Sequence, residues 1–155
     1  IMPVLSSPLL SIHVSIIMMS FALLSLTFIC GLTALILYVT HRIKHDEKTL
    51  IDNQLSSLYL LSKILLYPAM SALGIGIFVG AIWANISWGQ YWSWDPKEVW
   101  ALITFMFYAI VLHKKSLPVF SSPLCYHIYT TVAFAMILMT YFGVNYFLGG
   151  MHSYA

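Results

Sequence analysis

Residues 64–86 have the sequence ILLYPAMSALGIGIFVGAIWANI and contain no charged side chain. A bilayer core about 30 Å thick is crossed by about 20 apolar residues in a helix, so these 23 residues are long enough to span it. We therefore predict a transmembrane helix here.

Three further uncharged stretches flank this one: Val14–Val39, Val99–Leu112 and Leu124–Leu148. The first and last have 26 and 25 residues and meet the same length requirement. The middle one has only 14, which at about 1.5 Å per residue covers roughly 21 Å. It can cross if flanking residues enter the membrane and Lys114 and Lys115 extend outward from its end. We predict an all-α, polytopic membrane helix bundle with four transmembrane helices, forming one domain over residues 1–155.

Composition excludes several classes of protein. The chain is 61% hydrophobic and 8% charged, whereas a soluble domain is about 25% charged. Seven basic and five acidic residues cannot cover a soluble globule, and a disordered chain would need the opposite composition. A net charge of +2 is too small to indicate nucleic-acid binding. Cys30 and Cys125 form no CxxC or CxxCH motif, and the first residue, Ile1, leads us to expect a piece of a longer protein.

The basic residues predict the orientation, because Lys and Arg favour the cytoplasmic side. With four spans, Lys97 is the one basic residue outside and six lie inside: Arg42, Lys44, Lys48, Lys63, Lys114 and Lys115. Without a crossing by Val99–Leu112, the two basic loops would lie on opposite faces. We therefore expect both chain ends outside, a cytoplasmic loop over residues 41–63 and an outer tryptophan-rich loop over residues 87–98. Helically spaced apolar residues in 41–63 fit an interfacial amphipathic helix.

All five tryptophans lie within residues 83–100. An aromatic belt would place tryptophan at both membrane interfaces, but the inner interface has none. The concentration on one loop favours an aromatic platform for a flat, apolar ligand, with the belt as the alternative. The candidate platform residues are Trp88, Trp92 and Trp94.

The residues that follow, Asp95-Pro96-Lys97-Glu98, have the pattern of a helix start. Asp at the N-cap, Pro at the first helical position and Glu at the third are typical of a capping box. This structural role is sufficient to explain Asp95 and Glu98, and a carboxylate pair for acid–base chemistry is the weaker alternative.

Two histidines share the outer face with the tryptophan loop. His13 lies at the outer end of the first span, and His152 lies just beyond the outer end of the last. A single interfacial histidine is more often structural. Two at matching depth beside an aromatic platform could supply both axial ligands to a haem iron.

Two other histidines lie near the inner ends of the predicted third and fourth spans. His113 ends the short third span, where an ionisable group near the hydrocarbon boundary is a functional hypothesis. His127 lies one turn into the fourth span, and we interpret it as a group that hydrogen-bonds within the bundle.

Three motifs carry a resemblance to a known family. Residues 80–113, GAIWANISWGQYWSWDPKEVWALITFMFYAIVLH, resemble the tryptophan-rich WWD signature of haem-handling membrane proteins. The flanking motifs SPLLSIHVSIIMMSFALL (7–24) and GVNYFLGGMHSY (143–154) agree. Within that superfamily the chain most resembles the C-terminal portion of the CcsA/ResC branch, the System II cytochrome c biogenesis proteins.

The resemblance implies roles for particular residues. Histidines before and after the WWD segment ligate haem at the outer face, and these positions match His13 and His152. A membrane histidine after the segment receives haem from the inner side, which matches His113. The candidate haem-binding residues are then His13, Trp88, Trp92, Trp94, Asp95, His113 and His152.

The resemblance also implies a function. It predicts export of haem b and its presentation for covalent attachment to a CxxCH apocytochrome c, as part of a cytochrome c synthase. The implied partners are a CcsB/ResB-type subunit or fused region, apocytochrome c and membrane lipid, with no nucleic acid. The implied location is a bacterial inner membrane, with the thylakoid membrane as the alternative. The runner-up function is a System I-type exporter that hands haem to a chaperone, and a quinone- or lipid-binding subunit is the non-haem alternative.

Overall fold

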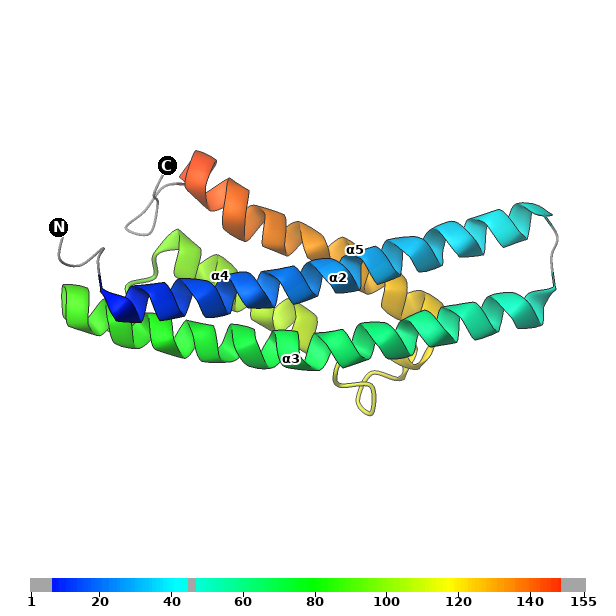
Figure 1. The fold of residues 1–155 in the computed structure, drawn as a ribbon, viewed down its shortest axis with the longest axis horizontal. Helices are drawn as coiled ribbons and strands as arrows, with labels where there is room; N and C mark the ends of the chain where they lie inside the picture. Colours follow the sequence, from blue (N-terminus) through cyan, green and yellow to red (C-terminus); the bar gives the residue numbers. More distant parts are fainter. Residues whose placement is uncertain (1–6, 45–46, 149–155) are drawn as a thin grey trace.

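The computed structural model describes residues 7–44 and 47–148, and in these ranges it contains helices and no strand. The elements are α2 (Pro8–Lys44), α3 (Lys48–Trp88), α4 (Pro96–Ile110), the 3-10 turn η1 (Pro118–Ser121), α5 (Pro123–Leu138) and the π-helix η2 (Met139–Leu148). Figure 1 shows α2 and α3 side by side as a long antiparallel hairpin. Helix α5 and η2 cross this hairpin diagonally toward the end where α2 begins. The predicted all-α bundle is confirmed.

Three helical segments of the described chain are long and apolar enough to cross a membrane: Pro8–Lys44, Lys48–Trp88 and Pro123–Leu148. Helix α4 has 15 residues and reaches about 22 Å at 1.5 Å per residue. These helices support a membrane bundle, while the fourth crossing and its orientation stay predictions.

The segment 41–63, predicted as a cytoplasmic loop that contains an interfacial amphipathic helix, is helical at both of its ends. Residues 41–44 complete α2, and α3 begins at Lys48 and continues without a break through Lys63. The first turns of α3 are not a separate interfacial helix, because Leu55 and Ser62 are buried within the bundle. With 37 and 41 residues, α2 and α3 are about 55 and 60 Å long, nearly twice the thickness of a bilayer core.

The predicted outer loop, 87–98, is shorter than expected. Trp88 is the last residue of α3, and Gly89 ends the helix with a φ of 79° while its N–H donates to the Asn85 carbonyl. This left-handed cap suits glycine, which has no Cβ to clash. Helix α4 then begins at Pro96, so only residues 89–95 form the connection between the two helices.

Hydrogen bonds between helices tie the core together. The Ser20 hydroxyl donates to the Ala69 carbonyl at 2.8 Å and joins α2 to α3. Thr104 and Thr140 join α4 to η2 through their hydroxyls, 2.9 Å apart. Inside an apolar bundle such polar groups must be paired with one another, and small hydroxyl residues let helices approach closely.

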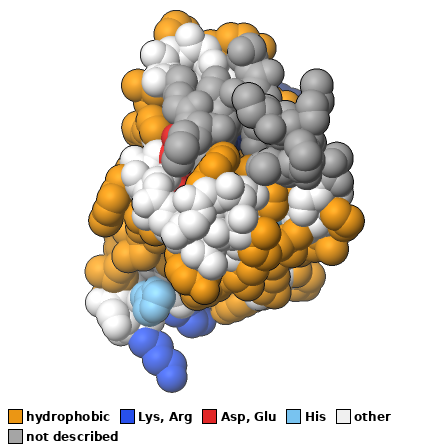
Figure 2. All heavy atoms as spheres, turned by 90° about the vertical axis from the view of Figure 1, so that its left-hand side faces the viewer, with side chains coloured by type: hydrophobic (Ala, Val, Ile, Leu, Met, Phe, Trp, Pro, Cys, Tyr) orange, Lys and Arg blue, Asp and Glu red, His pale blue; other side chains and the backbone are white. Residues whose placement is uncertain are grey.

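The outer surface of the bundle is apolar. Large hydrophobic side chains on α2 and α3 remain exposed, including Phe78 at 74% and Ile86 at 72%. Figure 2 views the end of the molecule that carries the α3–α4 connection, and hydrophobic side chains cover its flanks while Lys and Arg gather at the lower edge. A surface of this kind fits contact with lipid rather than water.

Candidate functional site

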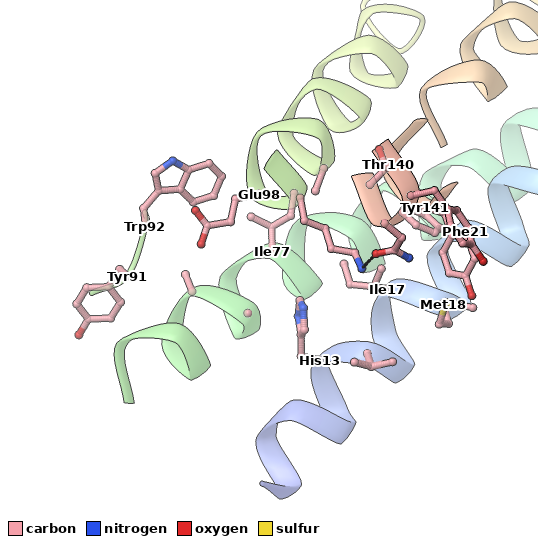
Figure 3. Close-up of a pocket in the computed structure, with 17 residues that line it drawn as sticks. His13, Ile17, Met18, Phe21, Ile77, Tyr91, Trp92, Glu98, Thr140 and Tyr141 are labelled. Carbon is pink, nitrogen blue, oxygen red and sulfur yellow. Dashed lines mark hydrogen bonds between the residues drawn. The ribbon is translucent and has the colours of Figure 1, made fainter. Parts of the chain in front are cut away.

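A cavity of about 480 Å³ lies between α2, α3, α4, η2 and the α3–α4 connection. Its volume is within the range of pockets that take a drug-sized ligand. Apolar residues of α2 form one wall, and polar groups come from several elements; they are His13, Tyr91, Trp92, Lys97, Glu98, Thr140 and Asn145. Figure 3 shows His13 entering from α2, Trp92 from the connection and Tyr141 from η2. We call this space the outer cavity.

His13 is held in one orientation by α3. Its Nδ1 lies 2.8 Å from the carbonyl oxygen of Gly76, and a carbonyl only accepts, so Nδ1 carries the proton. In neutral imidazole the lone pair is then on Nε2, the nitrogen that can ligate a metal. A backbone carbonyl on the other ring nitrogen is the usual support of a metal-binding histidine. His13, predicted as a ligand, therefore lines the cavity with its Nδ1 bound to the backbone of α3.

Gly80 makes room for this imidazole. A Cβ added at Gly80 would lie 2.5 Å from Cε1 and 2.8 Å from Nδ1 of His13. Real Cβ atoms do not approach other heavy atoms so closely, so any larger residue would displace the ring. The small residues of α3 thus determine how closely His13 packs against it.

The predicted capping box is confirmed. The Asp95 side chain accepts from the Lys97 N–H at 3.3 Å, and the Glu98 side chain accepts from the Asp95 N–H at 3.3 Å. Glu98 also accepts from the Ser93 N–H at 2.9 Å. Asp95 is only 6% exposed and does not line the cavity, so its described contacts are those of a helix cap.

The tryptophans do not form one continuous platform. Trp92 lines the outer cavity, whereas Trp88 and Trp94 do not. Trp88 packs edge-on against the core residue Trp83, with ring centres 4.8 Å apart. Trp94 is 73% exposed, has a φ of 60°, and its ring meets that of Trp92 edge-on at 5.9 Å. Of these three tryptophans, Trp92 is therefore the one that lines the cavity, and Trp94 packs against it from outside.

Lys97 and Asn145 are cavity residues that sequence reasoning did not select. The Lys97 ammonium donates to the Asn145 side-chain oxygen at 2.9 Å, the hydrogen bond drawn in Figure 3. Burial lowers the pKa of Lys97, and the charge of nearby Asp95 opposes this shift. The one available signal was that Lys97 is the only basic residue on the predicted outer side.

The π-helix η2 brings Thr140, Tyr141, Asn145 and Tyr146 to the cavity. π-Helical segments are rare and occur mostly at functional sites. Close packing accompanies the wide turn, because a Cβ on Gly143 would overlap the sulfur of Met139. Helical periodicity in the sequence does not distinguish a π-helix from an α-helix, so these residues could not be assigned to one face.

The inner histidines lie elsewhere. His113 is exposed, follows the end of α4, and its Nδ1 lies 2.8 Å from the Ala109 carbonyl oxygen. It is not a lining residue of the outer cavity. His127 is fully buried, and its Nε2 lies 3.2 Å from the Leu55 carbonyl oxygen, which confirms the predicted hydrogen bond within the bundle.

The connection that follows His113 runs beside α3 at a distance from the outer cavity. After α4 the chain passes beside α3, where the Tyr59 hydroxyl donates to the Phe120 carbonyl at 3.3 Å. Tyr59 precedes Gly80 by 21 residues in one helix, a separation of about 32 Å at 1.5 Å per residue. The connection therefore passes α3 far from the outer cavity.

The second predicted outer ligand, His152, lies outside the described residues. It follows the last described residue, Leu148, by four positions. In the described ranges no group of three or more His, Cys, Asp or Glu residues could hold a bare metal ion. Iron carried within a porphyrin needs axial ligands only, because the ring supplies the other four nitrogens.

Comparison with known proteins gives a consistent result. Residues 1–152 match the family described as cytochrome C assembly protein. Protein NrfI of Wolinella succinogenes is 40% identical over 155 residues, covering 100% of this chain and 17% of that protein. The cytochrome c biogenesis protein CcsA of Chlamydomonas reinhardtii is 37% identical, covering 99% of this chain and 42% of that protein. CcsA of Saccharum officinarum is 32% identical, covering 99% and 58%. The chain thus spans between about a sixth and three-fifths of these relatives.

Proposed function

Because the chain belongs to the cytochrome c assembly protein family, we propose that it binds haem b in the outer cavity and presents it for attachment to apocytochrome c. The observation that carries this proposal is the position of His13. Its Nδ1 donates to the Gly76 carbonyl, so the nitrogen that can ligate iron is Nε2, and His13 lines a cavity of about 480 Å³ that Trp92 also lines. A haem site needs an aromatic or apolar surface for the flat porphyrin ring and an axial ligand for the iron.

The residues have separate roles in this proposal. His13 supplies one axial ligand, and His152 supplies the other. Trp92 contacts the porphyrin face, and the capping box of Asp95 and Glu98 holds the α3–α4 connection in place. Binding in this way would leave the porphyrin edge accessible to a second protein.

The attachment reaction needs little from the chain beyond orientation. Each cysteine thiol of a CxxCH motif adds across one haem vinyl group. A C–S bond forms, the thiol proton ends on the neighbouring carbon, and nothing leaves. Such an addition gains mainly from holding the two reactants in the correct geometry. We propose that the protein acts in this way as part of a System II cytochrome c synthase.

Delivery of haem from the inner side is assigned to His113. It lies three residues beyond Ile110, the end of α4, and Ile110 is nine residues, or about 14 Å of helical rise, from the cavity residue Ala101. Because both axial ligands of one iron must meet at the same ring, His113 belongs to an earlier site. Its second ligand and a CcsB/ResB-type partner region belong to sequence outside this chain. The membrane is a bacterial inner membrane, with the tryptophan loop facing outward.

The test compares His13→Ala with His113→Ala in the intact protein expressed with an apocytochrome c. His13→Ala should change the axial-ligand bands of the haem spectrum and reduce cytochrome assembly, and added imidazole should restore part of both. His113→Ala should reduce haem content while the spectrum of the remaining haem is unchanged. Unchanged ligand bands in His13→Ala would refute the outer site. Normal haem content with an altered spectrum in His113→Ala would refute the two-site arrangement.

A further inference from the structure

We infer that Lys97, together with Asn145, binds a carboxylate of the porphyrin and so determines which edge of the haem faces away from the α4–η2 wall. This inference rests on the proposed haem-binding function. Haem b has two propionate groups on one edge and its vinyl groups on the other side of the ring. A cavity that only offered apolar contacts and an axial ligand would not distinguish the two edges.

The chemistry of the α4–η2 wall favours a carboxylate. Lys97 comes from the first turn of α4, Asn145 comes from η2, and their side chains meet at 2.9 Å in the cavity. An ammonium has three N–H donors and an amide has two, so the pair can present adjacent donors to one carboxylate. Hydrogen bonds between a charged donor and a carboxylate are roughly twice as strong as neutral ones.

The acidic residues nearby accept hydrogen bonds from the backbone, and the charge of Asp95 also acts on Lys97. Glu98, which also lines the cavity, accepts from the N–H groups of Ser93 and Asp95. Asp95 accepts from the backbone of the first turn of α4. Both carboxylates thus lie at a helix N-terminus, where the helix dipole stabilises negative charge. The cationic group of this wall is Lys97.

The sequence supplies a second, independent observation. Six of the seven Lys and Arg residues lie on the predicted inner side, and Lys97 is the exception. A basic residue placed against the orientation signal and half-buried beside a ligand cavity is of the kind that binds an anionic ligand. A porphyrin propionate is such a ligand, and it would bind in addition to the nearby charge of Asp95.

His13 and the Lys97–Asn145 pair come from different walls of the cavity. His13 is held by α3 through Gly76, while Lys97 and Asn145 join α4 to η2. An iron ligand on one wall and a carboxylate partner on another define both the position of the ring and its rotation about the iron. With the propionate edge on the α4–η2 wall, the vinyl edge is presented away from it, toward an incoming thiol.

The test uses two ligands: iron protoporphyrin IX and its dimethyl ester, which has no carboxylate. Both are titrated into the intact, purified protein and into the variants Lys97→Met, Lys97→Arg and Asn145→Asp. We expect the acid-to-ester affinity ratio to be at least about tenfold higher in the wild type than in Lys97→Met, the effect of losing one charge-assisted hydrogen bond. Lys97→Arg should retain most of the preference. Asn145→Asp should lose the preference for the acid, because the new carboxylate would pair with the Lys97 ammonium.

The outcomes separate this inference from the function on which it rests. Failure of the wild type to bind either porphyrin refutes the proposed function. Binding by the wild type with the same acid-to-ester ratio in Lys97→Met refutes the carboxylate site and leaves haem binding standing. If Lys97→Met loses both ligands through misfolding, Asn145→Asp decides: an unchanged ratio overturns the inference, and a reduced ratio with ester binding intact supports it.

Discussion

Gly80 and His13 illustrate how single residues determine the site. Because the imidazole lies where a Cβ at position 80 would be, the identity of one helical glycine controls the position of the predicted iron ligand. In a helix interior glycine is less favourable than alanine by about 1 kcal/mol. At position 80 this cost in helix stability accompanies the close packing of the His13 ring.

Gly80→Ala should therefore weaken haem binding without unfolding the protein. The new methyl group would displace the His13 ring, while the gain in helix propensity offsets part of the packing cost. The matched control is Gly74→Ala in the same helix, where the nearest atom to a Cβ is the Phe105 ring at 3.3 Å. Haem titration and thermal unfolding of both variants measure the two effects. Equal haem affinity in both would contradict the assigned role of His13.

Trp92 is the second position where a single side chain can be tested. It lines the cavity, whereas Trp94 is 73% exposed and meets it edge-on. Trp92→Ala should lower haem affinity more than Trp94→Ala, and Trp92→Phe should be milder because a ring is retained. Haem retention after washing compares the three. An equal loss in both alanine variants would favour an aromatic belt over a ligand-facing ring.

At the scale of elements, the start of α4 determines where the tryptophan connection ends. The capping box joins Asp95 to the first turn and draws Glu98 back to Ser93 and Asp95. Since these bonds involve neighbouring residues, this element boundary forms independently of the distant helices.

Asp95→Asn should retain the helix cap and most of the haem, because Asn is as good an N-cap as Asp. Asp95→Ala should lower the free energy of unfolding by about 1 kcal/mol through loss of the cap. Chemical denaturation and the haem spectrum of each variant check both expectations. A folded Asp95→Asn protein without haem would instead assign the carboxylate a direct role in binding.

At the scale of the whole molecule, the membrane topology depends on whether α4 crosses the membrane. Its 15 residues are short for a span, yet the basic residues on either side of it predict a crossing. The connection before α4 contains Trp92 and Trp94, and the connection after it contains Lys114 and Lys115.

Cysteine labelling in intact cells can determine this topology. Cys30 and Cys125 are first changed to Ala. Gln90→Cys then places one exposed thiol in the connection before α4, and Ser116→Cys places one in the connection after it. A membrane-impermeant thiol reagent should label Gln90→Cys directly and Ser116→Cys only after permeabilisation. Labelling of both from the same side would show that α4 does not cross.

The features that the sequence alone determined are those that depend on neighbouring residues. Long uncharged runs predict membrane helices because length and composition suffice, and the cap at Asp95 depends on residues within one turn. The internal hydrogen bond of His127 also followed from its depth in an apolar segment. Composition and motif order were sufficient for the family as well.

Only the tertiary structure decided which of these residues meet. The contact of His13 with Gly76 joins positions 63 residues apart, and that of Lys97 with Asn145 joins positions 48 apart. Both depend on the rotation of each helix and on the π-helical turn of η2, which periodicity does not reveal. For the same reason the sequence grouped Trp88 and Trp94 with Trp92, although only Trp92 lines the cavity. It also predicted an interfacial amphipathic helix within 41–63, whereas in the structure α3 continues from Lys48 without a break and Leu55 is buried in the bundle.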